Sequence, residues 1–267
     1  MTQSSTLLRQ PLFSTALMKI FFPDNVFSKI LFNNLPEEDR KLISFKESAA
    51  LSMEVRQDSS SIALMPVSDI ITNKEFFISS SLGISFVESL CNSYIYYNSE
   101  EEIINEFKLA GDISTVEAII GLIFFKENYE LDFKMNIALN NDELISSNHI
   151  LTGDKNFINE KYEKGISFAE EITELISAPF VNYVLASGDD KNLKKYSDRF
   201  SEAIKNLDRQ DIKIPGSFSD ETKSFIKENL PTVIYNLEER DQEGIRQVVS
   251  LPYYHGIIKD IIDIKFV

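Results

Sequence analysis

The sequence has 267 residues and a formal net charge of −15. Hydrophobic residues make up 43% and charged residues 26%, which is enough apolar material for a core and excludes wholesale disorder. The acidic surplus repels nucleic-acid phosphates and anionic lipids, and no run of Lys and Arg compensates for it. We therefore expect neither nucleic acid nor a membrane as a partner.

The sequence also bears on the cellular compartment. Cys91 is the single cysteine, so no intrachain disulfide forms, and a buried structural thiol is expected. No apolar stretch reaches the roughly 18 residues that a membrane helix needs. The semi-apolar stretch at 7–22 is interrupted by Arg9, Gln10 and Lys19, which is a poor pattern for a signal peptide. We expect a cytoplasmic protein.

In the first 100 residues, short apolar runs alternate with helical patterns, which predicts an α/β fold with a mainly parallel sheet. Asp24 or Asn25 is expected to cap a helix that starts at Val26. The wholly apolar run at 62–65 is typical of a strand buried on both faces. The predicted strands are 17–22, 42–45, 62–65, 76–84 and 91–97, and the predicted helices are 26–32 and 48–55.

In the middle of the chain, the segment 116–125 is apolar nearly all round and predicts a buried helix. The C-terminal third is expected to be purely helical. The remaining expectations are helices at 100–107, 167–176, 193–207, 220–230 and 238–251, and strands at 137–139, 149–151 and 180–186.

Several segments resemble, in chain order, one known family. They are IALMPVSD at 62–69, NSYIYY at 92–97, DIST at 112–115, ILTGD at 150–154, YEKG at 162–165 with APFV at 178–181, and the acidic stretch 237–244. This ordered set resembles the chorismate dehydratase family of the futalosine route to menaquinone, over about residues 20–258.

The resemblance implies a two-lobed, periplasmic-binding-protein-like (type 2) α/β fold with mixed sheets and a helical C-terminal segment. Lobe one would comprise residues 1–95 together with 185–267, and lobe two residues 96–184. The ligand would lie in the cleft between them. The implied activity is a carbon–oxygen lyase reaction that removes water from chorismate to give 3-[(1-carboxyvinyl)oxy]benzoate.

The resemblance also implies which residues meet the substrate. Asn25 or Asp24 would lie near the reacting carbons. The chorismate carboxylates would be held by the ligand-binding residues Asn92, Ser93, Ser114, Thr115, Gly153 and Asp154.

Each of these residues also has a plain structural explanation. Asn25 or Asp24 suits a helix cap, and Ser114 or Thr115 suits the cap of the following helix. Ser93 suits a strand end, and Asp154 suits a loop or a cap. The sequence leaves both interpretations open.

The sequence departs from the family at Asn92, where the family has an arginine, and in a blurred first-strand motif. Loss of an arginine weakens recognition of the chorismate dianion. The alternative is therefore a non-catalytic protein of the same fold that binds a small carboxylate or an aromatic ligand, as a sensor or orphan binding protein. A third hypothesis is an acidic helical interaction protein. His149 and His255 are distant in sequence, and neither a metal nor another cofactor is expected.

Overall fold

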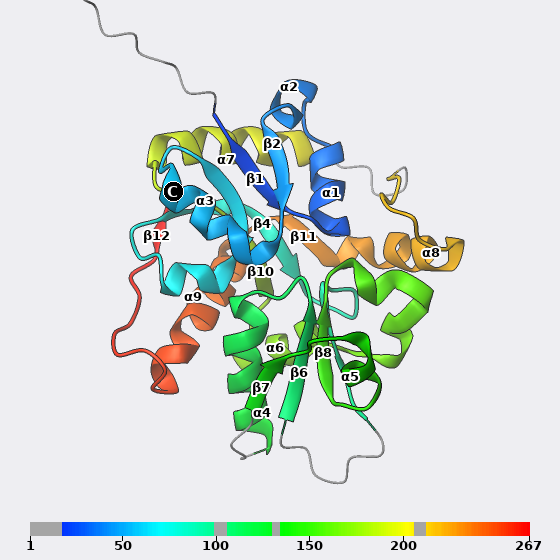
Figure 1. Ribbon diagram of the computed structural model, residues 1–267. Helices are drawn as coiled ribbons and strands as arrows, with labels where there is room; N and C mark the ends of the chain where they lie inside the picture. The colour runs from blue at the N-terminus through cyan, green and yellow to red at the C-terminus, as the bar shows by residue number, and fades with distance from the viewer. Residues whose placement is uncertain (1–17, 99–105, 130–133, 206–211) are drawn as a thin grey trace, which may run out of the picture.

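The computed structural model describes residues 18–98, 106–129, 134–205 and 212–267, and these form two lobes (Figure 1). The first lobe is built on a seven-stranded sheet and the second on a five-stranded sheet. The strands of the first lobe are β1 (Ile20–Pro23), β2 (Ile43–Lys46), β3 (Ile62–Pro66), β4 (Phe77–Phe86), β10 (Phe180–Ser187), β11 (Val233–Asn236) and β12 (Lys265–Phe266). Those of the second are β5 (Ser93–Tyr96), β6 (Glu106–Gly111), β7 (Lys134–Ile137), β8 (His149–Thr152) and β9 (Ile166–Ser167).

The sheet of the first lobe has the order β2-β1-β3-β10-β4-β11, and β12 also pairs with β4. β1 is parallel to β2 and to β3, whereas β10 is antiparallel to both β3 and β4. All residues of β3 and β10 are buried, as expected for central strands that are mainly apolar. The sheet is therefore mixed, with a parallel half formed by β1, β2 and β3.

The sheet of the second lobe has the order β7-β6-β8-β5-β9, in which β6 is parallel to β7 and β8. The chain changes from the first sheet to the second between β4 and β5, and returns between β9 and β10. The division of the lobes at 95/96 and 184/185 stays a prediction. Pairing within the sheets puts β5 wholly in the second lobe and β10 wholly in the first.

Most predicted helices are confirmed, and of the two residues expected to cap the first helix, Asp24 or Asn25, the cap is Asn25. Asn25 caps the first helix by accepting the amide of Ser28, and Ser167 caps α6 by accepting the amide of Glu170. The helices are α1 (Val26–Asn33), α2 (Glu37–Arg40), α3 (Leu51–Gln57), α4 (Gly121–Tyr129), α5 (Asn141–Ile145), α6 (Phe168–Ile176), α7 (Asp190–Ile204), α8 (Asp220–Asn229) and α9 (Glu239–Tyr254). A π-helical turn, Val116–Ile120, leads into α4, and the 3-10 turns are Ser48–Ala50, Val67–Ile71, Asp154–Lys164 and Leu230–Thr232.

Three expectations about secondary structure are wrong. Residues 106 and 107 belong to β6 rather than to a helix, and residues 100–105 of that expected helix lie outside the described residues. The strand expected at 137–139 lies earlier, at Lys134–Ile137. The C-terminal third is not purely helical, because β11 and β12 both pair with β4. In β11, Val233 and Tyr235 are buried while Ile234 and Asn236 are half-buried, the alternation of a strand with one covered face.

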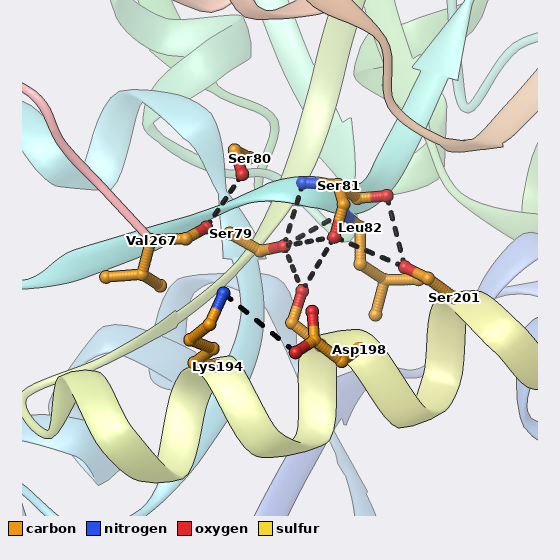
Figure 2. A network of polar contacts seen from close by, with 9 residues as sticks. Ser79, Ser80, Ser81, Leu82, Lys194, Asp198, Ser201 and Val267 are labelled. Atoms are coloured by element: carbon orange, nitrogen blue, oxygen red, sulfur yellow. Dashed lines mark hydrogen bonds and ion pairs between the residues drawn. The ribbon is translucent and has the colours of Figure 1, made fainter.

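Hydrogen bonds among serine side chains connect α7 to an irregular part of β4 (Figure 2). This serine cluster comprises Ser79 and Ser81 of β4 with Ser197 and Ser201 of α7. Between its pairs with Val184 and Ala186 of β10, β4 bulges from Ile78 to Gly83. Ser79 Oγ accepts the backbone amides of Ser81 at 3.1 Å and Leu82 at 2.9 Å, and it hydrogen-bonds to Ser197 of α7. The buried Ser79 hydroxyl thus accepts hydrogen bonds from two backbone amides within the bulge.

We expect Ser79→Ala to lower the free energy of unfolding by about 1–3 kcal/mol, because two amides and the Ser197 hydroxyl lose a buried partner. Urea unfolding followed by circular dichroism measures the change. The matched control is Ser201→Ala in the same cluster, whose hydroxyl makes only longer contacts of 3.3 Å and is partly exposed. Equal effects of the two substitutions would contradict a special role for Ser79.

Candidate ligand-binding site

The segments that follow β1, β2 and β3 face the segments that follow β6 and β8 across the boundary between the lobes. A cavity of about 460 Å³ opens at this boundary. Its lining comes from both lobes: Asp24, Glu47 and Ala49 from the first, and Gly111, Asp112, Ile113, Ile137 and Lys155 from the second. Boundaries between lobes are common places for ligand pockets, so this is the candidate site.

Two carboxylates of the second lobe bind backbone amides of the first. Asp154, after β8, accepts the amide of Val26 at the start of α1 at 2.7 Å. Asp112, after β6, accepts the amide of Ser48 at 2.8 Å and the Ser48 hydroxyl at 2.6 Å. The free amides at the start of a helix attract negative charge, so these contacts hold the two lobes together.

Burial raises the pKa of both carboxyl groups above the ordinary aspartate value, and it outweighs the opposing hydrogen bonds from Ser48 and Val26. The negative charge of Asp24 raises both pKa values further. Lys29, which lies 2.5 Å from Asp24 and 3.7 Å from Asp154, partly offsets the effect at Asp154.

The hydroxyl of Tyr183, in β10, is the centre of a buried polar cluster. The Ser48 hydroxyl donates its one hydrogen to Asp112, so the Tyr183 hydroxyl, 2.9 Å away, donates to Ser48 Oγ. Tyr183 in turn accepts from Asn92 Nδ2 at 3.0 Å. The amide nitrogen of Asn25 is buried and has no hydrogen-bond partner among the described residues. The cluster joins segments far apart in the sequence at one point between the lobes.

A second cluster lies within the second lobe, around Glu117 in the π-helical turn. Glu117 is 1% exposed, and its Oε1 accepts the Ser93 hydroxyl at 2.7 Å. Its Oε2 accepts the Ser114 amide at 2.9 Å and the Ser114 hydroxyl at 2.7 Å. Burial raises the pKa of Glu117, and the hydrogen bonds from Ser114 and Ser93 oppose that rise.

Thr115 forms a third contact between the lobes. Its hydroxyl donates to Asp69 Oδ1 at 2.6 Å and lies 2.6 Å from Ser68 Oγ, which donates to it. Asp69 and Ser68 belong to the turn after β3, so the ends of β1, β2 and β3 each contact the second lobe.

The structure brings the sequence-predicted site residues to this boundary, mostly in structural contacts. Asn25 caps α1 and is fully buried, whereas Asp24 lines the cavity with its side chain 58% exposed. Gly153 has φ +88°, a conformation that glycine adopts readily, and its amide donates to Asn92 O at 2.8 Å. Asn92 Oδ1 is buried and has no hydrogen-bond partner among the described residues.

Sequence reasoning missed Glu117, Ser48 and Tyr183. The spacing Ser114-Thr115-Val116-Glu117 matches a capping box, and the bond from the Ser114 amide back to Glu117 is half of that motif. This local signal was available. No local signal links Ser48 to Tyr183, because the contact is made between residues 135 positions apart.

The remaining reactive groups lie elsewhere. Cys91 is buried, its thiol donates to Ser93 O at 2.8 Å, and burial raises the pKa of the thiol, so it is a structural residue as expected. His149 stacks on Tyr96, and burial lowers the pKa of its imidazole. Across the described ranges, no three His, Cys, Asp or Glu side chains group as metal ligands. No helix in those ranges is long and apolar enough to cross a membrane.

We expect Tyr183→Phe to lower the free energy of unfolding by about 1–3 kcal/mol, because Asn92 Nδ2 loses a buried acceptor. Chemical denaturation measures this value. Tyr254→Phe is the matched control, since the Tyr254 side chain is 69% exposed and a change within about 0.5 kcal/mol is expected there. A neutral Tyr183→Phe substitution would mean that the hydroxyl cluster adds nothing to the contact between the lobes.

We expect stability to fall as pH rises from the ordinary aspartate range through the raised pKa values of Asp112 and Asp154. A carboxyl whose pKa is higher in the folded state binds its proton more tightly there, so protonation favours folding. Unfolding free energies at about pH 4, near the ordinary aspartate pKa, and at about pH 7.5 measure this difference, which should shrink in Asp112→Asn. The control is Asp198→Asn, at an exposed residue of α7, which should leave the difference unchanged.

No family model matches the sequence, and no curated protein matches it. Solved structures do match. Protein AF1704 from Archaeoglobus fulgidus has a TM-score of 0.62 at 11% identity, covering 90% of this chain and 98% of that chain. The alkanesulfonate-binding protein SsuA from Xanthomonas axonopodis pv. citri, bound to MOPS, has a TM-score of 0.62 at 8% identity, covering 92% and 96%.

The periplasmic aliphatic sulphonate binding protein SsuA from Escherichia coli has a TM-score of 0.53 at 11% identity, covering 92% of this chain and 90% of that chain. At such low identities the likeness shows the fold alone. The predicted fold class is confirmed: the chain has the two-lobed α/β fold of periplasmic binding proteins.

Proposed function

We propose that this protein binds a small molecule between its two lobes and leaves it chemically unchanged. The observation that carries the proposal is the polar boundary itself, where a cavity lined by both lobes lies beside the cluster around Tyr183. Asn92 Oδ1, buried without a partner among the described residues, is an acceptor that a ligand donor or a water would satisfy.

The fold supports the same proposal by analogy. Two of the similar structures are named as sulfonate-binding proteins, and one of them is bound to MOPS. Function does not follow from fold, so the analogy favours a small organic ligand without naming it.

The contacts between the lobes explain how such a ligand would act. Asp112 and Asp154 already satisfy amides of the first lobe, so the lobes close through the protein's own groups. A ligand at the cavity mouth would add contacts to both lobes at once and stabilise the closed form further. Binding would therefore raise thermal stability by mass action.

The second candidate is dehydration of chorismate. It is favoured by one observation: hydrogen bonds join four of the segments that resemble the dehydratase family, 62–69, 92–97, 112–115 and 150–154, and Ser93 and Ser114 belong to the cluster around Glu117. The hydroxyls of Ser93 and Ser114 are engaged by Glu117, which weighs against their holding a chorismate carboxylate.

Two measurements on the same preparation separate these functions. Incubation with chorismate, followed by mass spectrometry, reports loss of one water. A thermal-shift screen of small organic molecules, with recovery of each stabilising compound, reports binding without change. Enzyme-dependent dehydration would contradict the binding proposal and support the lyase. Stabilisation by a compound recovered intact would support binding, and a folded protein that no compound stabilises would contradict it.

We expect Ala49→Trp to weaken binding of any compound from that screen at least about tenfold, because Ala49 lines the cavity mouth and an indole would fill it. Isothermal titration measures the affinity. Met53→Trp, on the exposed face of α3 and 56% exposed, is the matched control and should bind normally. Equal binding by both variants would place the ligand outside this cavity.

A further inference from the structure

Residues of the second lobe alone line another cavity, called the second-lobe cavity below. Its volume is about 550 Å³, within the range of small-molecule pockets, and it shares no lining residue with the cavity between the lobes. Ile150 of β8 packs near Gly121 of α4, and side chains alternate along a strand, so His149 and Leu151 point to the opposite face of the sheet. The second-lobe cavity lies on that opposite face, between β8, α5 and the turn at 161–164.

The charged residues that line this cavity are basic, in a protein with a net charge of −15. They are Lys161 and Lys164, both exposed, and neither forms an ion pair with a residue that the structure describes. Burial lowers the pKa of the His149 imidazole, a hydrogen bond to Ser147 opposes this, and the positive charge of Lys161 lowers the pKa further. The Lys161 ammonium therefore lies close to the His149 ring.

The acidic residues of the same turn face α8 instead of this cavity. The carboxylate of Glu160 accepts the Ser219 hydroxyl at the start of α8 and lies 3.3 Å from the Thr222 hydroxyl. Glu163, between the two lysines in sequence, lines a different cavity together with residues of α8. The turn thus separates its charges, so that the ammonium groups line the second-lobe cavity and the carboxylates do not.

The backbone just before the lysines is strained. Asn159 and Glu160 have φ +56° and +49°, in the left-handed region that residues with a Cβ atom adopt at a cost in free energy. They interrupt the helical path of 154–164, and the turn that follows lies against β5, where the backbone of Gly165 meets the Tyr96 ring. Such strain is common at binding sites, and here it accompanies the placement of both lysines beside the cavity.

The remaining walls suit an aromatic ring. Tyr96 and His149 stack with their ring centroids 4.8 Å apart, and a hydrogen bond from His149 Nδ1 to the Ser147 carbonyl, at 3.0 Å, fixes the imidazole. Leu144 and Ile145 of α5 line the cavity from another side, and Ile145 is 81% exposed. A flat ring would find a stacked aromatic pair and exposed aliphatic side chains in one cavity.

We propose that the second-lobe cavity binds a small aromatic acid, with its acid group at the two lysines and its ring between the stacked pair and α5. Ammonium groups in water attract one anion only weakly, so burial of the apolar ring supplies the rest of the affinity. The site is separate from the proposed function, because its lining belongs to one lobe. It gives an acidic protein a local place for an anion.

Titration of the wild-type protein with 2-naphthoate, followed by proton NMR, tests the inference. We expect saturable binding that shifts the ring resonances of His149, while those of His255, the other histidine, which lies near Glu127 and outside the cavity lining, stay unmoved. Naphthalene-2-carboxamide has the ring without the charge, and inorganic phosphate has the charge without the ring. Each should bind at least about tenfold more weakly than 2-naphthoate.

Paired substitutions locate the acid group. Lys161→Met together with Lys164→Met should weaken the binding of 2-naphthoate at least about tenfold, because both positive charges of the lining are removed. The matched control is Lys191→Met together with Lys227→Met, at exposed positions on α7 and α8, which removes the same charge elsewhere and should bind as the wild type does. Thermal denaturation checks that each variant is folded.

Four results would overturn the inference: no saturable binding of 2-naphthoate by the folded wild type, equal binding of the amide, an unmoved His149, or equal losses in the two lysine pairs. Ala49→Trp, which fills the cavity between the lobes, should leave this binding unchanged, and loss of binding there would also overturn it. Compounds that Ala49→Trp excludes belong to the proposed function, and compounds that the Lys161 and Lys164 variant excludes belong to this site. Either proposal can therefore fail without the other.

Discussion

The contact between the lobes depends on carboxylates that accept backbone amides. Asp154 and Asp112 follow parallel strands of the second lobe, and they reach the amides of Val26 and Ser48, which follow parallel strands of the first. Carboxyl ends of parallel strands lie at one edge of a sheet, so each lobe presents its polar turns to the other. Each sheet holds its own lobe together, and the hydrogen bonds between amides and carboxylates set the position of one lobe against the other.

The boundary differs in kind from the interior of either lobe. Inside the lobes, strands such as β3 and β10 are continuously buried and mainly apolar. At the boundary the buried groups are hydroxyls, amides and carboxylates. Their net contribution to the stability of the fold depends on each of them having a hydrogen-bond partner. A ligand in the neighbouring cavity would add its contacts to a boundary that the chain already holds together by its own hydrogen bonds.

Local features were predictable and distant pairings were not. The buried strand β3 follows from its own apolar residues and is confirmed, and a cap of α1 at Asp24 or Asn25 was expected, of which the structure has Asn25. β11 and β12 were missed, because each is short and pairs with β4 from far along the chain. The resemblance drew attention to Ser93 and Ser114, but the acceptor of their hydroxyls, Glu117, lies 24 positions from Ser93 and is fixed by tertiary structure.

The burial of Cys91 makes the protein suitable for labelling with fluorescent dyes at introduced cysteines. Its thiol is the only one in the sequence, lies against Ser93 and Ser167, and has a raised pKa, so thiol-directed dyes react poorly with it in the native protein. Cysteines introduced at exposed positions on opposite lobes, such as Met53 on α3 and Ile145 on α5, would accept fluorophores without removal of the native residue. Energy transfer between the two dyes would then report the separation of the lobes in solution.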